Sequence, residues 1–274
     1  MSNLVSTDWL EVRLNDVRVV DASWYMPDEK REPAKEFEAG HIPGAVFFDI
    51  DGIADRSTGL PHMLPSPGEF SRAVGALGIG DGETVVVYDG SGMFSAPRVW
   101  WTFKAMGHDR VRVLDGGFPK WKREGRAVES GPAHPKTKFF TAIANPAILR
   151  DFAQVMGIVG DRSAQMVDAR SAARFKAEEP EPRAGVRGGH MPGALNVHYR
   201  KLIADDGTLK PPEALRGAFD AVDLGRPIVT TCGSGLTAAI LMLALDEIGA
   251  KDVALYDGSW TEWGGRPQAQ VVTD

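Results

Sequence analysis

The sequence has a single cysteine, Cys232, among 274 residues. One cysteine excludes a disulfide within the chain and any metal cluster that needs several thiolates. The chain also lacks the run of about 20 apolar residues that crosses a membrane, and its first residues lack the pattern of a secretory signal. The chain also has no excess of positive charge, because its net charge is -6. We therefore expect a cytoplasmic protein that binds neither nucleic acid nor a membrane.

Length and internal repetition both indicate two domains. The chain is longer than the roughly 100 to 150 residues of a common single domain. Four segments recur in the same order, at separations of 142 to 149 residues. The pairs are VVDASW from Val19 with MVDARS from Met166, AGHIPGAVFFD from Ala39 with GGHMPGALNVH from Gly188, VVVYDGSG from Val85 with IVTTCGSG from Ile228, and LDGGFPKW from Leu114 with YDGSWTEW from Tyr256. Four ordered matches indicate a duplicated chain.

The predicted architecture is two tandem α/β domains, in residues 1–129 and 147–274, joined by a proline-rich polar linker in 130–146. Each half alternates short apolar runs with helical patterns, which is typical of a mainly parallel sheet covered by helices on both faces. The predicted strands are 17–21, 84–88, 111–114, 165–168, 227–231 and 253–256, and the predicted helices are 67–77, 96–106, 146–159, 211–222 and 236–248. Ligands of such sheets bind beyond the carboxyl ends of the strands.

Cys232 lies at such a position, between the apolar strand PIVTT and a helix. A lone cysteine is most often a small buried hydrophobe. Here, however, Gly233 and Gly235 remove the steric bar to unusual backbone angles, so that successive N–H groups can curl inward as an anion-binding nest at the helix N-terminus. A structural cysteine needs neither glycine. We therefore predict that this loop stabilises a reactive thiolate.

The duplicated halves, the two HxPGA segments and the loop CGSGLTA together resemble the two-domain rhodanese family over essentially the entire chain. The resemblance implies two rhodanese-like domains, of which the second is catalytic. In the first repeat the position of Cys232 is taken by Asp89, which cannot be a sulfur nucleophile. The loop resembles the mercaptopyruvate-using branch, because the thiosulfate-using branch typically carries Arg and Lys after the cysteine. The implied active-site loop comprises Cys232, Gly233, Ser234, Gly235, Leu236 and Thr237.

The implied activity is sulfur transfer from 3-mercaptopyruvate through a persulfide on Cys232, with release of pyruvate. The acceptor is a thiol, thioredoxin or cyanide, and neither a metal nor an organic cofactor is expected. A cysteine phosphatase is excluded because its loop needs an arginine where Ala238 stands. Two alternatives stay open: a thiosulfate:cyanide sulfurtransferase, and a non-catalytic binding module with the rhodanese fold. A sulfur carrier for a partner enzyme is a third.

Two arginines, Arg174 and Arg183, precede the second HMPGA segment in RFKAEEPEPR. By resemblance to the family, they hold the carboxylate and the carbonyl of mercaptopyruvate, a task suited to the guanidinium fork. The alternative is two solvated surface arginines that balance Glu178, Glu179 and Glu181.

Asp51 and His62 match family residues proposed to form a polar relay with Ser234. In that relay Asp51 orients His62, and His62 activates the serine hydroxyl. The alternative is an aspartate and a histidine that fix a loop. His41 and His190 recur in the two HxPGA segments, and we expect them to be structural, in turns that pin a loop to the sheet.

Overall fold

The computed structural model describes residues 2–274, which divide by internal packing into two compact units. The N-terminal unit contains residues 2–55, 64–145 and 204–209, and the C-terminal unit contains residues 56–63, 146–203 and 210–274. Two short segments, 56–63 and 204–209, thus pack with the unit to which their sequence neighbours do not belong. The predicted linker, up to residue 145, groups with the N-terminal unit. No helix in the described range is long and apolar enough to span a membrane.

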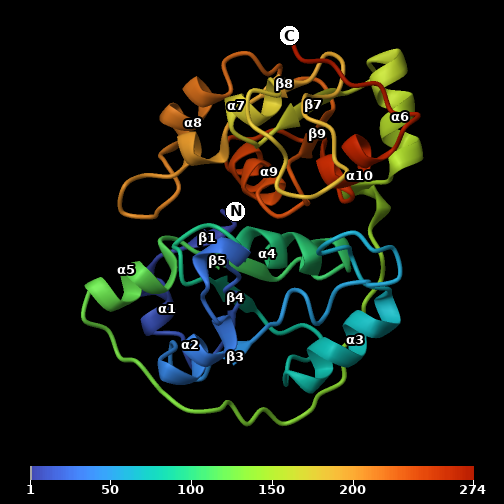
Figure 1. Cartoon of the computed structure of the whole chain (residues 1–274). Coiled ribbons are helices and arrows are strands. Elements are labelled where there is room, and N and C mark those ends of the chain that lie inside the picture. The colour runs from blue at the N-terminus through green and yellow to red at the C-terminus, as the bar shows by residue number, and fades with distance from the viewer. Residues whose placement is uncertain (1) are drawn as a thin grey trace. The chain divides into compact units, whose positions relative to one another are not determined.

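Each unit contains one five-stranded sheet in which all paired strands are parallel. The order in the N-terminal unit is β1 (Leu4–Val5), β5 (Val111–Leu114), β4 (Val85–Tyr88), β2 (Arg18–Asp21) and β3 (Val46–Phe47). The order in the C-terminal unit is β6 (Leu149–Arg150), β10 (Val253–Tyr256), β9 (Ile228–Thr231), β7 (Gln165–Asp168) and β8 (Leu195–Asn196). Equivalent strands occupy equivalent places, so the predicted pair of α/β domains is confirmed (Figure 1).

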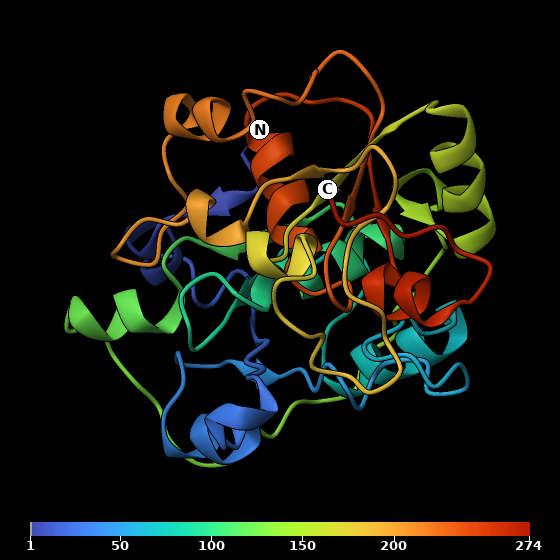
Figure 2. The same cartoon turned by 45° about the horizontal axis from the view of Figure 1, so that its top comes forward.

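Helices alternate with these strands. The N-terminal unit has α1 (Thr7–Glu11), α2 (Pro33–Ala39), α3 (Pro67–Ala76), α4 (Ala96–Ala105) and α5 (Gly117–Arg123). The C-terminal unit has α6 (Phe152–Asp161), α7 (Ala172–Phe175), α8 (Pro212–Ala218), α9 (Ala238–Glu247) and α10 (Ser259–Gly265). Helices α6 and α8 lie at opposite sides of the C-terminal unit in both views (Figures 1 and 2). Single 3₁₀ turns lie at Pro27–Glu29, Pro146–Ile148 and Tyr199–Leu202.

The central strands and the helix after each loop are buried. All four residues of β4 and of β9 are buried, as are the first eight residues of α9. A helix without a polar face cannot lie on a protein surface, so its sequence, AAILMLAL, itself requires coverage on every side. In the C-terminal core, Trp260 and Trp263 pack with Tyr256 and Val229. Helix α9 therefore begins in buried surroundings shortly after the carboxyl end of β9.

One predicted helix begins later than expected. The segment from Pro146 forms a 3₁₀ turn and then strand β6, and helix α6 begins only at Phe152. Asp151 caps that helix, because its carboxylate accepts the Gln154 N–H at 2.8 Å while the Gln154 side chain accepts the Asp151 N–H at 2.9 Å. The prediction missed this start because a two-residue strand is too short to show a hydrophobic period.

Candidate functional site

Cys232 follows β9 directly and is 2% exposed. The start of α10 fixes its backbone on both sides. The Cys232 N–H donates to Ser259 Oγ at 3.2 Å, and its carbonyl accepts the Trp260 N–H at 2.9 Å. The carbonyl of Gly233 accepts from both the N–H and the hydroxyl of Thr261, at 2.9 and 2.6 Å. These contacts engage only the backbone of Cys232 and Gly233, not the cysteine side chain.

The two loop glycines serve different purposes. Gly235 has φ +78°, a left-handed conformation that favours glycine, as predicted. The prediction was wrong for Gly233, whose φ is not positive. What Gly233 provides is space, because a Cβ there would lie 2.9 Å from Nη2 of Arg174. In the described chain, the N–H groups of Thr237 and Ala238 have no protein acceptor.

The loop of the first repeat that is equivalent to the Cys232 loop binds a carboxylate. Asp89 is 1% exposed, and its carboxylate accepts four backbone N–H groups at 2.8 to 2.9 Å. The donors are Ser91, Phe94, Ser95 and Ala96. The repeat alignment makes the counterparts of these donors Ser234, Thr237, Ala238 and Ala239. The Ala239 N–H donates to the Leu236 carbonyl at 3.3 Å, so the N–H groups of Ser234, Thr237 and Ala238 are the counterparts that suit a buried anion on sulfur, which needs donors in place of water.

Replacing Asp89 by asparagine should destabilise the N-terminal unit and leave sulfur transfer nearly unchanged. An amide nitrogen cannot accept a hydrogen bond, and the lost negative charge weakens the bonds that remain. We expect a loss of about 1.5 to 3 kcal/mol of unfolding free energy, measured by urea denaturation. Asp16→Asn, at an exposed position, is the matched control and should leave stability unchanged. A folded Asp89→Asn protein without turnover would contradict the expectation, since it would give the first repeat a part in the chemistry.

Arg174 lies beside the cysteine loop. It comes from the last turn of α7, its side chain is 22% exposed, and its Nη2 is the atom nearest to the missing Cβ of Gly233. Glu181 accepts from its Nε at 3.3 Å and from its Nη2 at 2.5 Å. Arg174 is therefore not the freely solvated arginine of the alternative interpretation. Arg183 is half-buried in the same unit, and its predicted contact with substrate stays a prediction.

Sequence reasoning missed Arg170, which is 2% exposed. Its guanidinium donates to Asp168, to Glu181 and to the Gly189 carbonyl, and it lies 4.1 Å above the ring of Trp260. Burial alone lowers the pKa of Arg170, but the two carboxylates outweigh it and raise that pKa above its ordinary value. The sequence did contain a signal for Arg170. In the repeat alignment Arg170 corresponds to Ser23, so a charged residue stands where the first repeat has a small polar one.

The three members of the predicted relay do not share one unit. Asp51 belongs to the N-terminal unit, where it accepts the indole N–H of Trp24 at 2.7 Å. His62 is buried, has φ +59°, and belongs to the segment 56–63 that packs with the C-terminal unit, which also contains Ser234. The relay itself stays a prediction.

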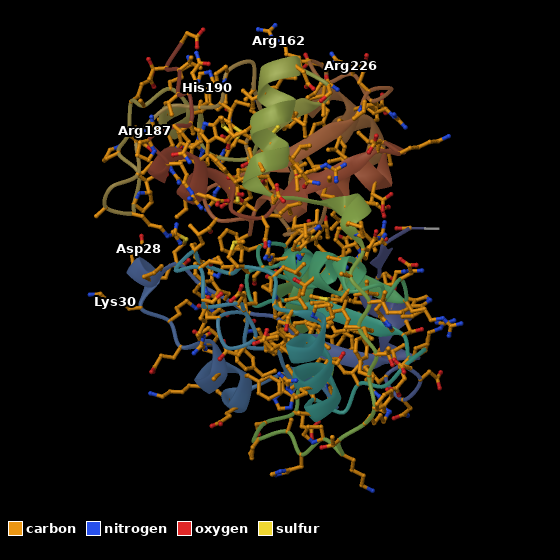
Figure 3. The ribbon with its side chains drawn as sticks, turned by 90° about the vertical axis from the view of Figure 1, so that its right-hand side faces the viewer. Asp28, Lys30, Arg162, Arg187, His190 and Arg226 are labelled. Carbon is orange, nitrogen blue, oxygen red and sulfur yellow. The ribbon has the colours of Figure 1, made fainter. Side chains whose placement is uncertain are left out.

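His41 and His190 are buried and fixed as expected of structural residues. Their rings stack on Phe37 and Phe175, with centroids 4.0 and 3.7 Å apart, and each Nδ1 contacts the carbonyl of the same phenylalanine. His190 appears with Arg187 in Figure 3. The Arg187 side chain donates to four carbonyls, those of Trp263, Gly264, Arg266 and Ala269, and so ties its segment to the end of α10.

These features define a duplicated α/β protein with one thiol at the carboxyl end of a parallel strand, in an N–H-lined loop. The rhodanese-like domain matches residues 6–124 and 151–266, and the chain belongs to that family. No group of three or more side chains suited to a metal ion occurs within residues 2–274.

Relatives cover nearly the full length. The 3-mercaptopyruvate sulfurtransferase of Homo sapiens is 42% identical, over 98% of this chain and 94% of the human protein. The thiosulfate sulfurtransferase of Bos taurus is 45% identical, over 95% of this chain and 91% of the bovine protein. The crystal structure of the mercaptopyruvate enzyme SseA from Escherichia coli aligns with a TM-score of 0.88 at 39% identity, over 95% of this chain and 99% of SseA. The names agree on sulfur transfer, which is the activity of this chain.

Proposed function

We propose that this sulfurtransferase takes its sulfur from 3-mercaptopyruvate and carries it as a persulfide on Cys232. Overall identity does not choose the donor, because relatives named for mercaptopyruvate and for thiosulfate are 42% and 45% identical. The observation that carries the proposal is the charge at the loop. Gly233 and Ser234 bring no cation, and the neighbouring Arg174 already has an anionic partner in Glu181. Such a site suits a donor with one carboxylate better than a compact dianion.

The reaction has two displacements at sulfur. The Cys232 thiolate attacks the mercaptopyruvate sulfur, and the carbon–sulfur bond breaks with its electron pair on the departing carbon. The resulting enolate takes a proton and leaves as pyruvate. An acceptor thiolate then attacks the outer sulfur of the persulfide, and the Cys232 thiolate departs. The N–H groups of the loop stabilise the anion on Cys232 before and after each step.

The polar residues have supporting roles in this proposal. Arg174 and Arg183 bind the carboxylate and the carbonyl of the donor, and the carbonyl contact stabilises the enolate as it forms. Ser234, His62 and Asp51 form the relay that delivers the proton. The acceptor is a small thiol or a thioredoxin, in the cytoplasm.

Mass spectrometry of the intact protein tests the proposal. After brief mixing with mercaptopyruvate and removal of the excess, the mass should rise by one sulfur atom, and pyruvate should appear in equal amount. Subsequent addition of a thiol should return the mass to its starting value, because the thiol removes the outer sulfur. A sulfur gain with thiosulfate and none with mercaptopyruvate would instead support the thiosulfate alternative that the bovine relative suggests.

A further inference from the structure

A buried carboxylate, Glu181, connects two arginines beside the cysteine loop. Its Oε1 accepts from Arg170 Nη1 at 2.7 Å and from Arg174 Nε at 3.3 Å, and its Oε2 accepts from Arg174 Nη2 at 2.5 Å. The Glu181 side chain is 4% exposed, whereas Glu178, in the same segment, is exposed. Little water therefore screens the charge of Glu181 from its neighbours.

Glu181 determines which donors of Arg174 stay available to a ligand. A guanidinium has five N–H bonds, and Glu181 takes the one on Nε and one of the two on Nη2. The other N–H on Nη2 and both on Nη1 have no protein acceptor within residues 2–274. Because Nη2 adjoins Gly233, these unused donors lie at the loop that follows the cysteine.

The same contacts set the charge of the site. Arg170 and Arg174 carry two positive charges, and their partners Asp168 and Glu181 carry two negative charges. The cluster is therefore neutral overall, and it offers N–H donors without excess positive charge. A ligand with one carboxylate can be satisfied by a single edge of Arg174, whereas a dianion brings a second charge that no uncompensated cation of this cluster meets.

The first repeat contains a related arrangement in which a hydroxyl, rather than a guanidinium, lies at the glycine. There Glu36 accepts from the Tyr25 hydroxyl at 3.0 Å and also pairs with Arg31. The Tyr25 hydroxyl contacts the position of a Cβ at Gly90, as Arg174 does at Gly233. Both repeats thus use a glutamate to hold a polar group against the glycine after Asp89 or Cys232. The group at Gly233 is the Arg174 guanidinium, whereas the group at Gly90 is the Tyr25 hydroxyl.

We propose that Glu181 is a positioning residue that determines donor choice: it fixes the Arg174 guanidinium at Gly233 and neutralises it, so that the site prefers a singly charged carboxylate donor to a dianion. This inference rests on the proposed function, because it explains how that donor is selected. Glu181 acts through Arg174 and does not itself touch the substrate.

The test is the ratio of kcat/KM for mercaptopyruvate to kcat/KM for thiosulfate in Glu181→Gln. Glutamine keeps the shape but removes the charge, so the freed positive charge should help the dianion, while the loosened fork should bind the carboxylate less well. We expect the ratio to fall by about tenfold or more. Glu178→Gln, at the exposed glutamate, is the control and should keep both activities. Glu181→Asp keeps the charge at a shorter reach, so both activities should fall while the ratio stays within about threefold of the wild-type ratio.

Equal losses with both donors in a folded Glu181→Gln protein would overturn the inference, because a merely structural residue lowers both alike. If Glu181→Gln does not fold, Glu181→Asp decides, and a ratio shifted there by tenfold would also overturn it. The proposed function is tested separately, by the intact mass of the wild-type protein. If the wild type gains no sulfur from mercaptopyruvate, the proposed function is wrong. The ratio of kcat/KM values in the Glu181 variants tests only the role of Glu181.

Discussion

Cys232→Ser should lower sulfur transfer by at least about 1000-fold while leaving the fold intact. A hydroxyl is close in size to a thiol but cannot form the persulfide, and this chain has no second cysteine to replace it. The fold should persist because the contacts that fix residue 232, with Ser259 and Trp260, are made by its backbone. Steady-state pyruvate release and the intact mass after mixing with donor are the two measurements.

The wild-type protein, measured alongside, should gain one sulfur, and the serine variant should gain none. A near-ultraviolet circular dichroism spectrum equal to that of the wild type would show that tertiary packing is retained. Appreciable turnover in a folded variant would mean that sulfur passes directly from donor to acceptor, and the persulfide mechanism would then be wrong.

Arg174→Gln should lower kcat/KM for mercaptopyruvate by about ten- to 150-fold, which corresponds to roughly 1.5 to 3 kcal/mol, the contribution of a charge-assisted hydrogen bond. Arg183→Gln should have an effect of the same size, since the two arginines are proposed to bind different groups of one donor. Glutamine retains most of the length of Arg174 but loses its charge and the fork. Glu181 stays paired with Arg170 in the variant, so its buried carboxylate is not left alone.

Two further variants make this result specific. Arg174→Lys keeps the charge without the fork, and we expect an intermediate loss. Arg72→Gln, at an exposed position of α3, removes one positive charge elsewhere and should leave kcat/KM unchanged. Unchanged kinetics in both Arg174→Gln and Arg183→Gln would remove these residues from the donor site.

The sequence predicted the duplicated fold and the place of Cys232 between a buried strand and a helix, because both depend on local patterns. The central strands are short and mainly apolar, and three of them, 111–114, 165–168 and 253–256, have the predicted bounds. The edge strands were missed because β1, β3, β6 and β8 contain only two residues each. Such strands exist through pairing with a neighbour, which no hydrophobic period records.

The environment of the arginines could not be predicted, because it depends on burial. Glu178, Glu179 and Glu181 occur within four residues, and as letters they are equivalent. Only the folded chain distinguishes Glu181, which pairs with Arg170 and Arg174. The conformation of Gly233 was mispredicted for a similar reason. Its small size was attributed to a backbone angle, whereas a side chain from a distant part of the sequence occupies the space.

Segments 56–63 and 204–209, which pack with the unit of the other repeat, affect how the chain could be divided into fragments. Residues 204–209 are fixed within the N-terminal unit, where the Leu209 N–H donates to Asp115 at 2.8 Å and Arg123 donates to the Asp206 carbonyl at 3.0 Å. The polypeptide consequently passes from one unit to the other at five places: after residues 55, 63, 145, 203 and 209. A protease cut between residues 130 and 146 would divide the sequence between its two repeats. The N-terminal fragment would still carry 56–63, which packs with the C-terminal unit, and the C-terminal fragment would still carry 204–209, which packs with the N-terminal unit. A fragment that begins at residue 147 would lack 56–63, including His62, and a fragment that ends at residue 146 would lack 204–209, so a cut between the two repeats does not follow the boundary of the packed units.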